Sequence, residues 1–236
     1  MRRRTGSEGE RRFIPERTKR VNTEHLIDLL SADLEPVGRV GFGKTLFVAM
    51  LMGGAAAFVV MLATVGPRVD LGSTAHLEWT TVKVIFAVSV ILTAAPQLLT
   101  LMRPGLEKET HPAVVLLPFA AAIVAAFAIL LFVTPSAWIM MVRGVTSVSP
   151  GRCLLCIIFF AAMPFAATVW ALRQGAPTRL GLCGALAGVV AGGFGAAAYA
   201  LTCASDSIPF IAVWYSAAIV LCAFIGAQIG LRILRW

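Results

Sequence analysis

Cys153 and Cys156, separated by two leucines, form the clearest reactive motif of this chain. Similar CxxC pairs serve membrane thiol oxidoreductases that pass electrons to quinone. Such an enzyme usually needs a second, loop-borne cysteine pair for exchange with its partner, and only Cys203 is predicted to lie on the same side. The motif therefore makes a quinone-linked thiol oxidoreductase an alternative function, to be weighed against the rest of the sequence.

A second motif, GRVGFGKT at residues 38–45, satisfies the phosphate-loop pattern GxxxxGK[ST]. A working phosphate loop follows a buried strand inside a soluble nucleotide domain, whereas here Glu35-Pro36-Val37 precedes it and a long apolar stretch follows. Lys44 is better interpreted as an anchor at a membrane edge. Because the histidines also lack metal-ligand spacing, the sequence indicates neither a zinc enzyme nor a bound cofactor.

The elements that must position these residues are six long apolar stretches. Hydrophobic residues make up 58% of the chain, against about 45 to 50% in soluble domains. A helix of about 20 residues crosses a hydrocarbon core of roughly 30 Å. The predicted fold is an all-α membrane bundle at 45–236 after a short segment, 1–44, with spans at residues 45–66, 84–102, 112–133, 153–172, 180–201 and 209–231.

Basic residues near the span ends predict how the bundle is oriented. Eight lie on the side of the N-terminus and four, Arg68, Lys83, Arg143 and Arg152, on the other. The positive-inside rule then places both termini in the cytoplasm. Because span four starts and span five ends at the outer face, Cys153 and Cys203 are expected at the same depth, where they could form a disulfide or bind a soft metal ion.

Small residues follow helical spacing in the last two spans. Gly184, Gly188 and Gly192 form overlapping GxxxG units in span five, and Gly226 and Gly230 repeat the spacing in span six. These faces are expected to pack inside the bundle, and they also allow a homodimer.

The other ionisable and thiol groups of the bundle are assigned simpler roles. Cys183 and Cys222 are interpreted as packing residues. Asp206 could help to hold a cation near Cys203, but it is interpreted as an exposed loop carboxylate. The apolar stretch 135–142 is too short to cross and is expected to pack at the membrane interface. No predicted span carries a charged residue in its middle, which argues against a transporter.

The N-terminal segment contains an amphipathic helix, predicted at residues 23–35. Its apolar face consists of Leu26, Ile27, Leu30 and Leu34, and its polar face includes Glu24, Asp28, Ser31 and Glu35. The segment holds no partner that could bury the apolar face, and anionic lipid would repel the acidic one. A protein with a basic, partly apolar groove suits this helix, although packing against the loops of the bundle is the alternative.

The C-terminal third carries a family resemblance. It reads WALRQGAPTR at 170–179, AYALTCASDS at 198–207, Trp214-Tyr215, and LRILRW at 231–236. With the TEHLIDLL segment at 23–30 and six spans, this resembles the NrsF family of negative regulators of sigma factor F. The resemblance covers about residues 21–236, and residues 1–20 extend beyond the family's usual start. It implies that Cys153 and Cys203 match the family's paired cysteines, while Cys156 is an addition.

The leading hypothesis is therefore a non-enzymatic, multi-pass anti-sigma factor of the bacterial inner membrane. Residues Leu26, Ile27, Leu30, Leu34, Glu24 and Asp28 are predicted to bind an extracytoplasmic-function sigma factor. Cys153 and Cys203, with Cys156 as a further candidate, are predicted to sense an oxidant or a heavy metal. The expected partners are this sigma factor and membrane lipid, with no direct contact to nucleic acid.

Overall fold

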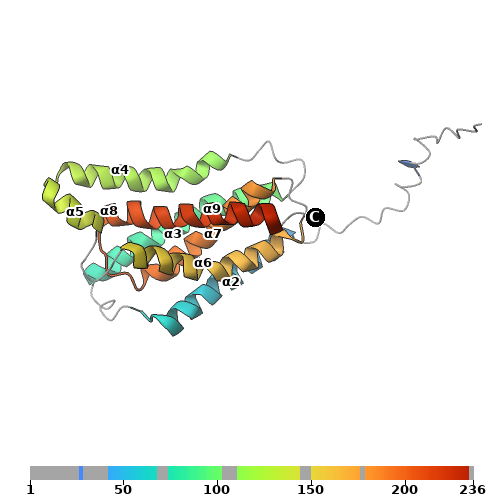
Figure 1. The fold of residues 1–236 in the computed structure, drawn as a ribbon, viewed down its shortest axis with the longest axis horizontal. Helices are drawn as coiled ribbons and strands as arrows, with labels where there is room; N and C mark the ends of the chain where they lie inside the picture. Colours follow the sequence, from blue (N-terminus) through green and yellow to red (C-terminus); the bar gives the residue numbers. More distant parts are fainter. Residues whose placement is uncertain are drawn as a thin grey trace, which may run out of the picture. The chain divides into compact units, whose positions relative to one another are not determined.

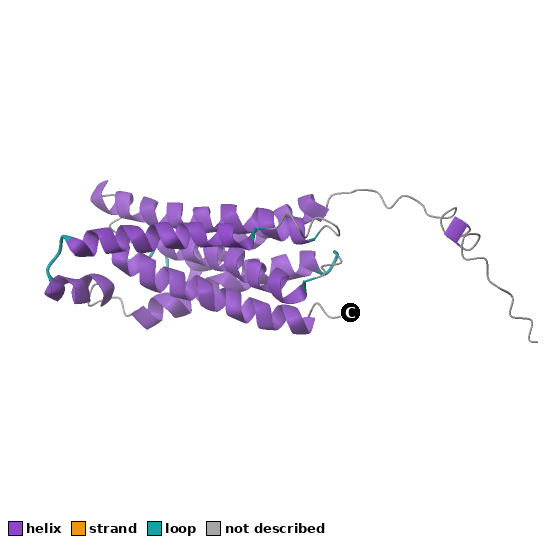
Figure 2. Cartoon of the chain, turned by 90° about the horizontal axis from the view of Figure 1, so that it is seen from above, coloured by secondary structure: helices purple, strands orange, loops and turns teal. Residues whose placement is uncertain are grey.

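The computed structural model describes residues 27–28, 42–67, 74–102, 111–143, 150–175 and 179–233. These residues form helices and turns, with no strand among them (Figure 2). The elements are α2 (Phe42–Thr64), α3 (Thr74–Leu101), the 3-10 turn η3 (Pro112–Leu116), α4 (Leu117–Leu131), α5 (Pro135–Arg143), α6 (Pro150–Leu172), α7 (Leu180–Ala200), α8 (Ile208–Phe210), the π-helical turn η4 (Ile211–Tyr215) and α9 (Ser216–Ile233).

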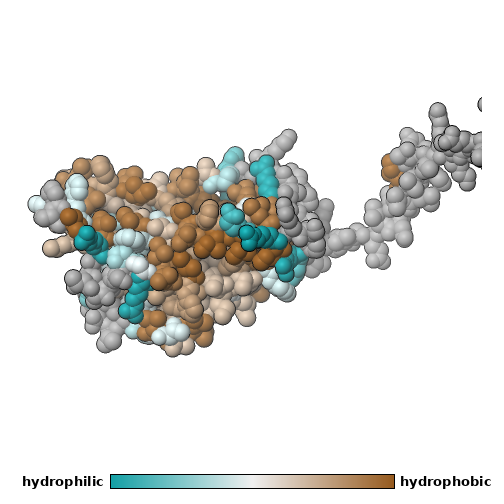
Figure 3. All heavy atoms as spheres, viewed as in Figure 1, coloured by the Kyte–Doolittle hydropathy of each residue, from teal (hydrophilic) through white to brown (hydrophobic). Residues whose placement is uncertain are grey.

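Six helical segments of this described part are long and apolar enough to cross a membrane. They are Gly43–Thr64, His76–Leu101, Pro112–Leu131, Pro150–Leu172, Leu180–Ala200 and Ile208–Ile233. In the space-filling view, hydrophobic side chains cover much of the middle of the bundle, and hydrophilic ones gather toward its two ends (Figure 3). This distribution is the one expected of helices that face lipid.

Helix α7 occupies the centre of the bundle. It packs against α9, α6 and α3, and α2 closes the bundle against α6. The apolar core of α7 is 72% buried, whereas that of the α4 span is 17% buried and lies at the edge of the bundle (Figure 1). The long helices run side by side along the bundle, with α2 tilted against the others (Figure 1).

Glycines allow α7 and α9 to approach backbone to backbone. A Cβ added to Gly184 would overlap the carbonyl oxygen of Gly226, and one added to Gly188 would overlap the carbonyl oxygen of Cys222. A Cβ on Gly230 would lie 2.8 Å from the carbonyl oxygen of Leu180. Both predicted GxxxG faces therefore meet in a close backbone contact between α7 and α9.

The end of the bundle where α2 ends and α3, α6 and α9 begin is called the distal end here. Helix α3 begins at Thr74 there, ten residues before the predicted start at Val84. Lys83 is therefore a helical residue, and its side chain is fully buried. This corrects the placement of Lys83 at the outer edge of span two, since it lies two turns inside the candidate span His76–Leu101.

The short apolar stretch after α4 forms helix α5, which is tied to the distal end by hydrogen bonds. The indole of Trp138 donates to the carbonyl oxygens of Leu130 (2.9 Å) and Val133 (3.0 Å). Ser207 donates to the carbonyl of Met141 at 2.8 Å, and the Trp214 indole donates to that of Val142 at 2.8 Å. Helix α5 therefore contacts the segment that connects α7 to α9.

Candidate functional site: a thiol pair on a buried polar anchor

Cys153 and Cys203 come together at the distal end. Cys153 lies in the first turn of α6, which starts with Pro150, and Cys203 lies three residues beyond the end of α7. Both cysteines carry free thiols and are buried. The two thiols lie within hydrogen-bonding range of each other. The expectation that these cysteines share one depth agrees with this arrangement.

Lys83 reaches the same site from α3. Its ammonium donates to the carbonyl oxygen of Cys203 at 2.9 Å and to Oδ1 of Asp206 at 2.9 Å. Because a buried ammonium is costly unless it is paired and hydrogen-bonded, these two acceptors account for its place in the interior. The ion pair connects residues 123 positions apart in the sequence.

Asp206 also binds His76, which lies two turns before Lys83 on α3. The His76 Nδ1 atom is 2.9 Å from Oδ2 of Asp206, so each carboxylate oxygen has its own partner. Between these two residues, the Thr80 hydroxyl donates to the His76 carbonyl at 2.9 Å. The Asp206 side chain is only 17% exposed, which corrects its interpretation as an exposed loop carboxylate. His76, Lys83 and Asp206 are called the polar anchor below.

The π-helical turn η4 adds a further polar group to the site. It ends at Tyr215, whose side chain is fully buried. The Tyr215 hydroxyl lies near the Cys203 sulfur and makes no well-aligned hydrogen bond among the described residues. Turns of π-helix occur frequently at functional sites, because they displace side chains from the regular helical register.

The surroundings of Cys203 favour its thiolate. The hydrogen bond from the Cys153 thiol lowers the pKa of Cys203, and the Lys83 ammonium and the backbone N–H of Ser205 lower this pKa further, against the opposing effect of burial. A thiolate is the form of cysteine that reacts with oxidants and binds soft metals. In the part of the chain that the structure describes, no group of three or more metal-ligating side chains occurs, so the site offers two sulfurs.

Cys156 is arranged differently from the other member of its CxxC motif. It is half-buried, and the Arg152 guanidinium donates a hydrogen bond to its sulfur. The cysteine in contact with Cys153 is Cys203, and the structure records no disulfide within the CxxC motif.

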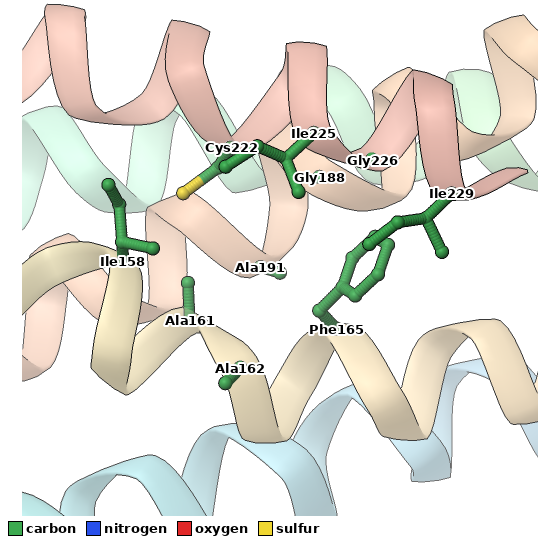
Figure 4. A pocket seen from close by; sticks show the side chains of 10 residues that line it. All are labelled: Ile158, Ala161, Ala162, Phe165, Gly188, Ala191, Cys222, Ile225, Gly226 and Ile229. Carbon is green, nitrogen blue, oxygen red and sulfur yellow. The ribbon is translucent and has the colours of Figure 1, made fainter.

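The remaining cysteines lie away from this site. Cys183 is fully buried in α7. Cys222 lines a cavity of about 180 Å³ between α6, α7 and α9, and its sulfur is directed into the space between α9 and α6 (Figure 4). Ile158, Phe165 and Ile229 are among the apolar residues that surround this cavity. An apolar setting of this kind fits the interpretation of Cys222 as a packing residue.

Of the predicted sigma-binding residues, the structure describes two. Ile27 and Asp28 are helical and exposed, and 58% of Ile27 is accessible. Glu24, Leu26, Leu30 and Leu34 lie outside the described residues, as does most of the predicted helix 23–35.

Comparison with known proteins identifies the family of this chain. The sequence model of the family described as "Negative regulator of sigma F" matches residues 30–236. The chain belongs to the NrsF family. The "Probable anti-sigma-F factor NrsF" of Azospira oryzae (strain ATCC BAA-33 / DSM 13638 / PS) is 32% identical over 216 residues, which cover 92% of this chain and all of the relative. No solved structure matches.

A second NrsF relative has similar coverage. The "Anti-sigma-F factor NrsF" of Caulobacter vibrioides (strain NA1000 / CB15N) is 30% identical over 219 residues, or 92% of this chain and all of that protein.

Sequence reasoning found the two cysteines of this NrsF chain but missed the polar anchor beside them. The sequence held one indication of the polar anchor. His76, Lys83 and Asp206 all lie near ends of predicted spans that face the same side of the membrane.

The ion pair makes a stability prediction. Asp206→Asn leaves the buried Lys83 ammonium without an anionic partner, so we expect the free energy of unfolding to fall by about 3 kcal/mol. The measurement is denaturant-induced unfolding of the protein in detergent micelles. Glu78→Gln, which neutralises an exposed carboxylate on the same helix, serves as the matched control and should change stability by less than about 0.5 kcal/mol. Equal effects of the two substitutions would contradict the assigned role of Asp206.

Proposed function

We propose that this protein is an anti-sigma factor of the bacterial inner membrane that sequesters an extracytoplasmic-function sigma factor. The observation that carries the proposal is the match of residues 30–236 to a family of negative regulators of sigma F. It is supported by two relatives named as anti-sigma-F factors, whose entire lengths this chain covers. The protein acts by holding the sigma factor away from RNA polymerase.

The membrane location rests on the six apolar helical segments and on the distribution of basic residues. The side of the N-terminus holds the larger number of Lys and Arg, which supports a cytoplasmic location of that side and of both termini. In this orientation the distal end, with Cys153 and Cys203, faces the periplasm. The sigma-binding and signal-receiving parts of the protein then lie on opposite sides of the membrane.

The sigma factor binds the predicted helix at residues 23–35. Its apolar face, which includes the exposed Ile27, enters a groove of the partner, and Glu24 and Asp28 meet basic residues around that groove. A genetic experiment tests the proposal. Deletion of the gene is expected to raise transcription from promoters of the cognate sigma factor, and reintroduction should restore repression. Unchanged transcription from the promoters of every sigma factor in the organism would contradict it.

The thiol pair, Cys153 and Cys203, is the sensor of the signal in this proposal. Oxidation of Cys153 and Cys203 to a disulfide, or binding of a soft metal ion by both sulfurs, favours a second packing of α6 against the end of α7. This change lowers the affinity of the cytoplasmic segment for the sigma factor. A coupling free energy of about 1 to 3 kcal/mol corresponds to a change in affinity of roughly 5- to 150-fold.

The sensor role predicts a loss of induction. The double variant Cys153→Ser/Cys203→Ser should bind the sigma factor normally but no longer induce its genes after treatment with an oxidant or cadmium, because neither sulfur remains. The measurement is a transcriptional reporter in the deletion strain. Cys222→Ser, in the apolar cavity between α6 and α9, is the matched control and should leave induction intact. Normal induction in the double variant would refute the sensor role without touching the anti-sigma function.

A further inference from the structure

The segment that carries Cys203 is held at both backbone groups of that residue. The N–H of Cys203 donates to the carbonyl of Tyr199 at 3.0 Å, which ties it to the last turn of α7. Its carbonyl oxygen accepts from Lys83 at 2.9 Å, which ties it to α3. With both groups fixed, the direction of the Cys203 side chain follows from the backbone. This direction brings its sulfur to Cys153.

The polar anchor restrains the same segment at a second point. Three residues after Cys203, the Asp206 carboxylate is bound by Lys83 on one oxygen and by His76 on the other. A single ammonium therefore holds two positions of the connection between α7 and α9. Cys153, by contrast, is placed by a regular helix and needs no such support.

We propose that Lys83 and Asp206 are positioning residues of the thiol pair, which hold Cys203 against Cys153 so that the two sulfurs can react or bind a ligand together. The inference deepens the proposed sensor and depends on it for its biological meaning. Loss of Lys83 leaves the buried Cys203 carbonyl without its donor. The segment then turns this carbonyl toward water and takes the sulfur away from Cys153.

Lys83 affects the stability of the disulfide in two opposite ways, through its charge and through its positioning of Cys203, and the two effects can be separated by experiment. A positive charge near the sulfurs stabilises the thiolate and therefore the reduced pair, so loss of charge alone would make the disulfide more stable. Loss of positioning makes the disulfide less stable. The double variant Lys83→Met/Asp206→Asn removes a neutral ion pair, leaves no unpaired buried charge and isolates the positioning effect.

The experiment is an equilibrium with glutathione, using the full-length protein in lipid nanodiscs with Cys156, Cys183 and Cys222 replaced by Ala. The thiols of Cys153 and Cys203 give up two electrons and two protons to form a disulfide, and oxidised glutathione takes them up as its own S–S bond breaks, giving two reduced glutathiones. In Lys83→Met/Asp206→Asn we expect the equilibrium constant for disulfide formation to fall at least roughly 10-fold, which equals about 30 mV in reduction potential.

Ser207→Ala is the matched control for this equilibrium. It removes the hydrogen bond to Met141 on α5 and the cap of α8, both from the same connection but neither toward α3, and should leave the constant within about 2-fold of the parent. A second measurement follows the modification of Cys203 by a maleimide in the parent, where this residue is 1% exposed. We expect modification to become at least roughly 10-fold faster in Lys83→Met/Asp206→Asn.

An equilibrium constant that is unchanged or raised in the double variant, with Cys203 still protected from maleimide, would overturn the positioning role. The failure of this inference is distinguishable from the failure of the sensor, because the glutathione equilibrium is measured without any sigma factor. Normal induction in Cys153→Ser/Cys203→Ser would refute the sensor and leave the positioning role in place.

Discussion

Substitution of Leu26 and Leu30 by Asp is expected to weaken binding of the sigma factor by at least roughly 100-fold. Both side chains lie on the predicted apolar face with Ile27, and an apolar groove would have to accept two carboxylates without partners. A loss of about 3 kcal/mol corresponds to this factor. Titration of the purified sigma factor against the full-length protein in nanodiscs measures it directly.

A matched control distinguishes the effect of disrupting the apolar face from the effect of adding negative charge to the helix. Ser31→Asp adds a carboxylate on the predicted polar face, among Glu24, Asp28 and Glu35. We expect its affinity to remain within about 3-fold of the parent, because an exposed charge near basic partner residues changes binding little. If Leu26→Asp/Leu30→Asp bound as tightly as Ser31→Asp, the predicted interface would be wrong, and another part of the chain would have to hold the sigma factor.

The second large effect is expected at the contact between α7 and α9. Gly226→Leu introduces a side chain whose Cβ alone would overlap the carbonyl oxygen of Gly184, at a point where both neighbours are backbone. Because neither helix can relieve this overlap by a rotamer change, we expect the free energy of unfolding to fall by about 3 kcal/mol. Unfolding in mixed detergent micelles, followed by circular dichroism, measures the loss.

Gly151→Leu is the control for this substitution. Gly151 lies in the first turn of α6, and a Cβ added there meets no atom within 4 Å. Its stability should remain within about 0.5 kcal/mol of the parent. Similar losses in the two variants would mean that the cost comes from leucine in a membrane helix in general, and that α7 and α9 do not depend on a close backbone approach.

The helices and the glycine faces that pack inside the bundle could be predicted from the sequence because both depend on local patterns. Apolar runs of about 20 residues indicate the spans. The spacing of Gly184, Gly188, Gly226 and Gly230 indicates which faces pack against other helices. Neither inference requires knowledge of which distant residues touch.

The polar anchor could not be predicted in the same way. Hydropathy treats Lys83 as the end of a span, since a charge in lipid is costly, and so the predicted span began at Val84. In the structure the charge is matched by Asp206 and the Cys203 carbonyl, which are more than 100 residues away. Only the arrangement of α3 beside the end of α7 shows that this partner exists.

The thiol pair could be predicted from the sequence only in part. The direction of successive spans placed Cys153 and Cys203 at one depth, which was sufficient to suggest that they meet. The same reasoning could not decide between Cys153 and Cys156, because both lie near the start of α6. The rotation of α6 about its axis makes that choice: it buries Cys153 beside Cys203 and leaves Cys156 beside Arg152.

The central claim, that this protein binds and restrains a sigma factor, is tested most directly by co-purification. The tagged full-length protein is isolated from membranes of cells that express each sigma factor of its own genome in turn. We expect one extracytoplasmic-function sigma factor to co-purify with the parent and to be lost from Leu26→Asp/Leu30→Asp. Failure of every sigma factor to co-purify with a correctly inserted protein would contradict the account.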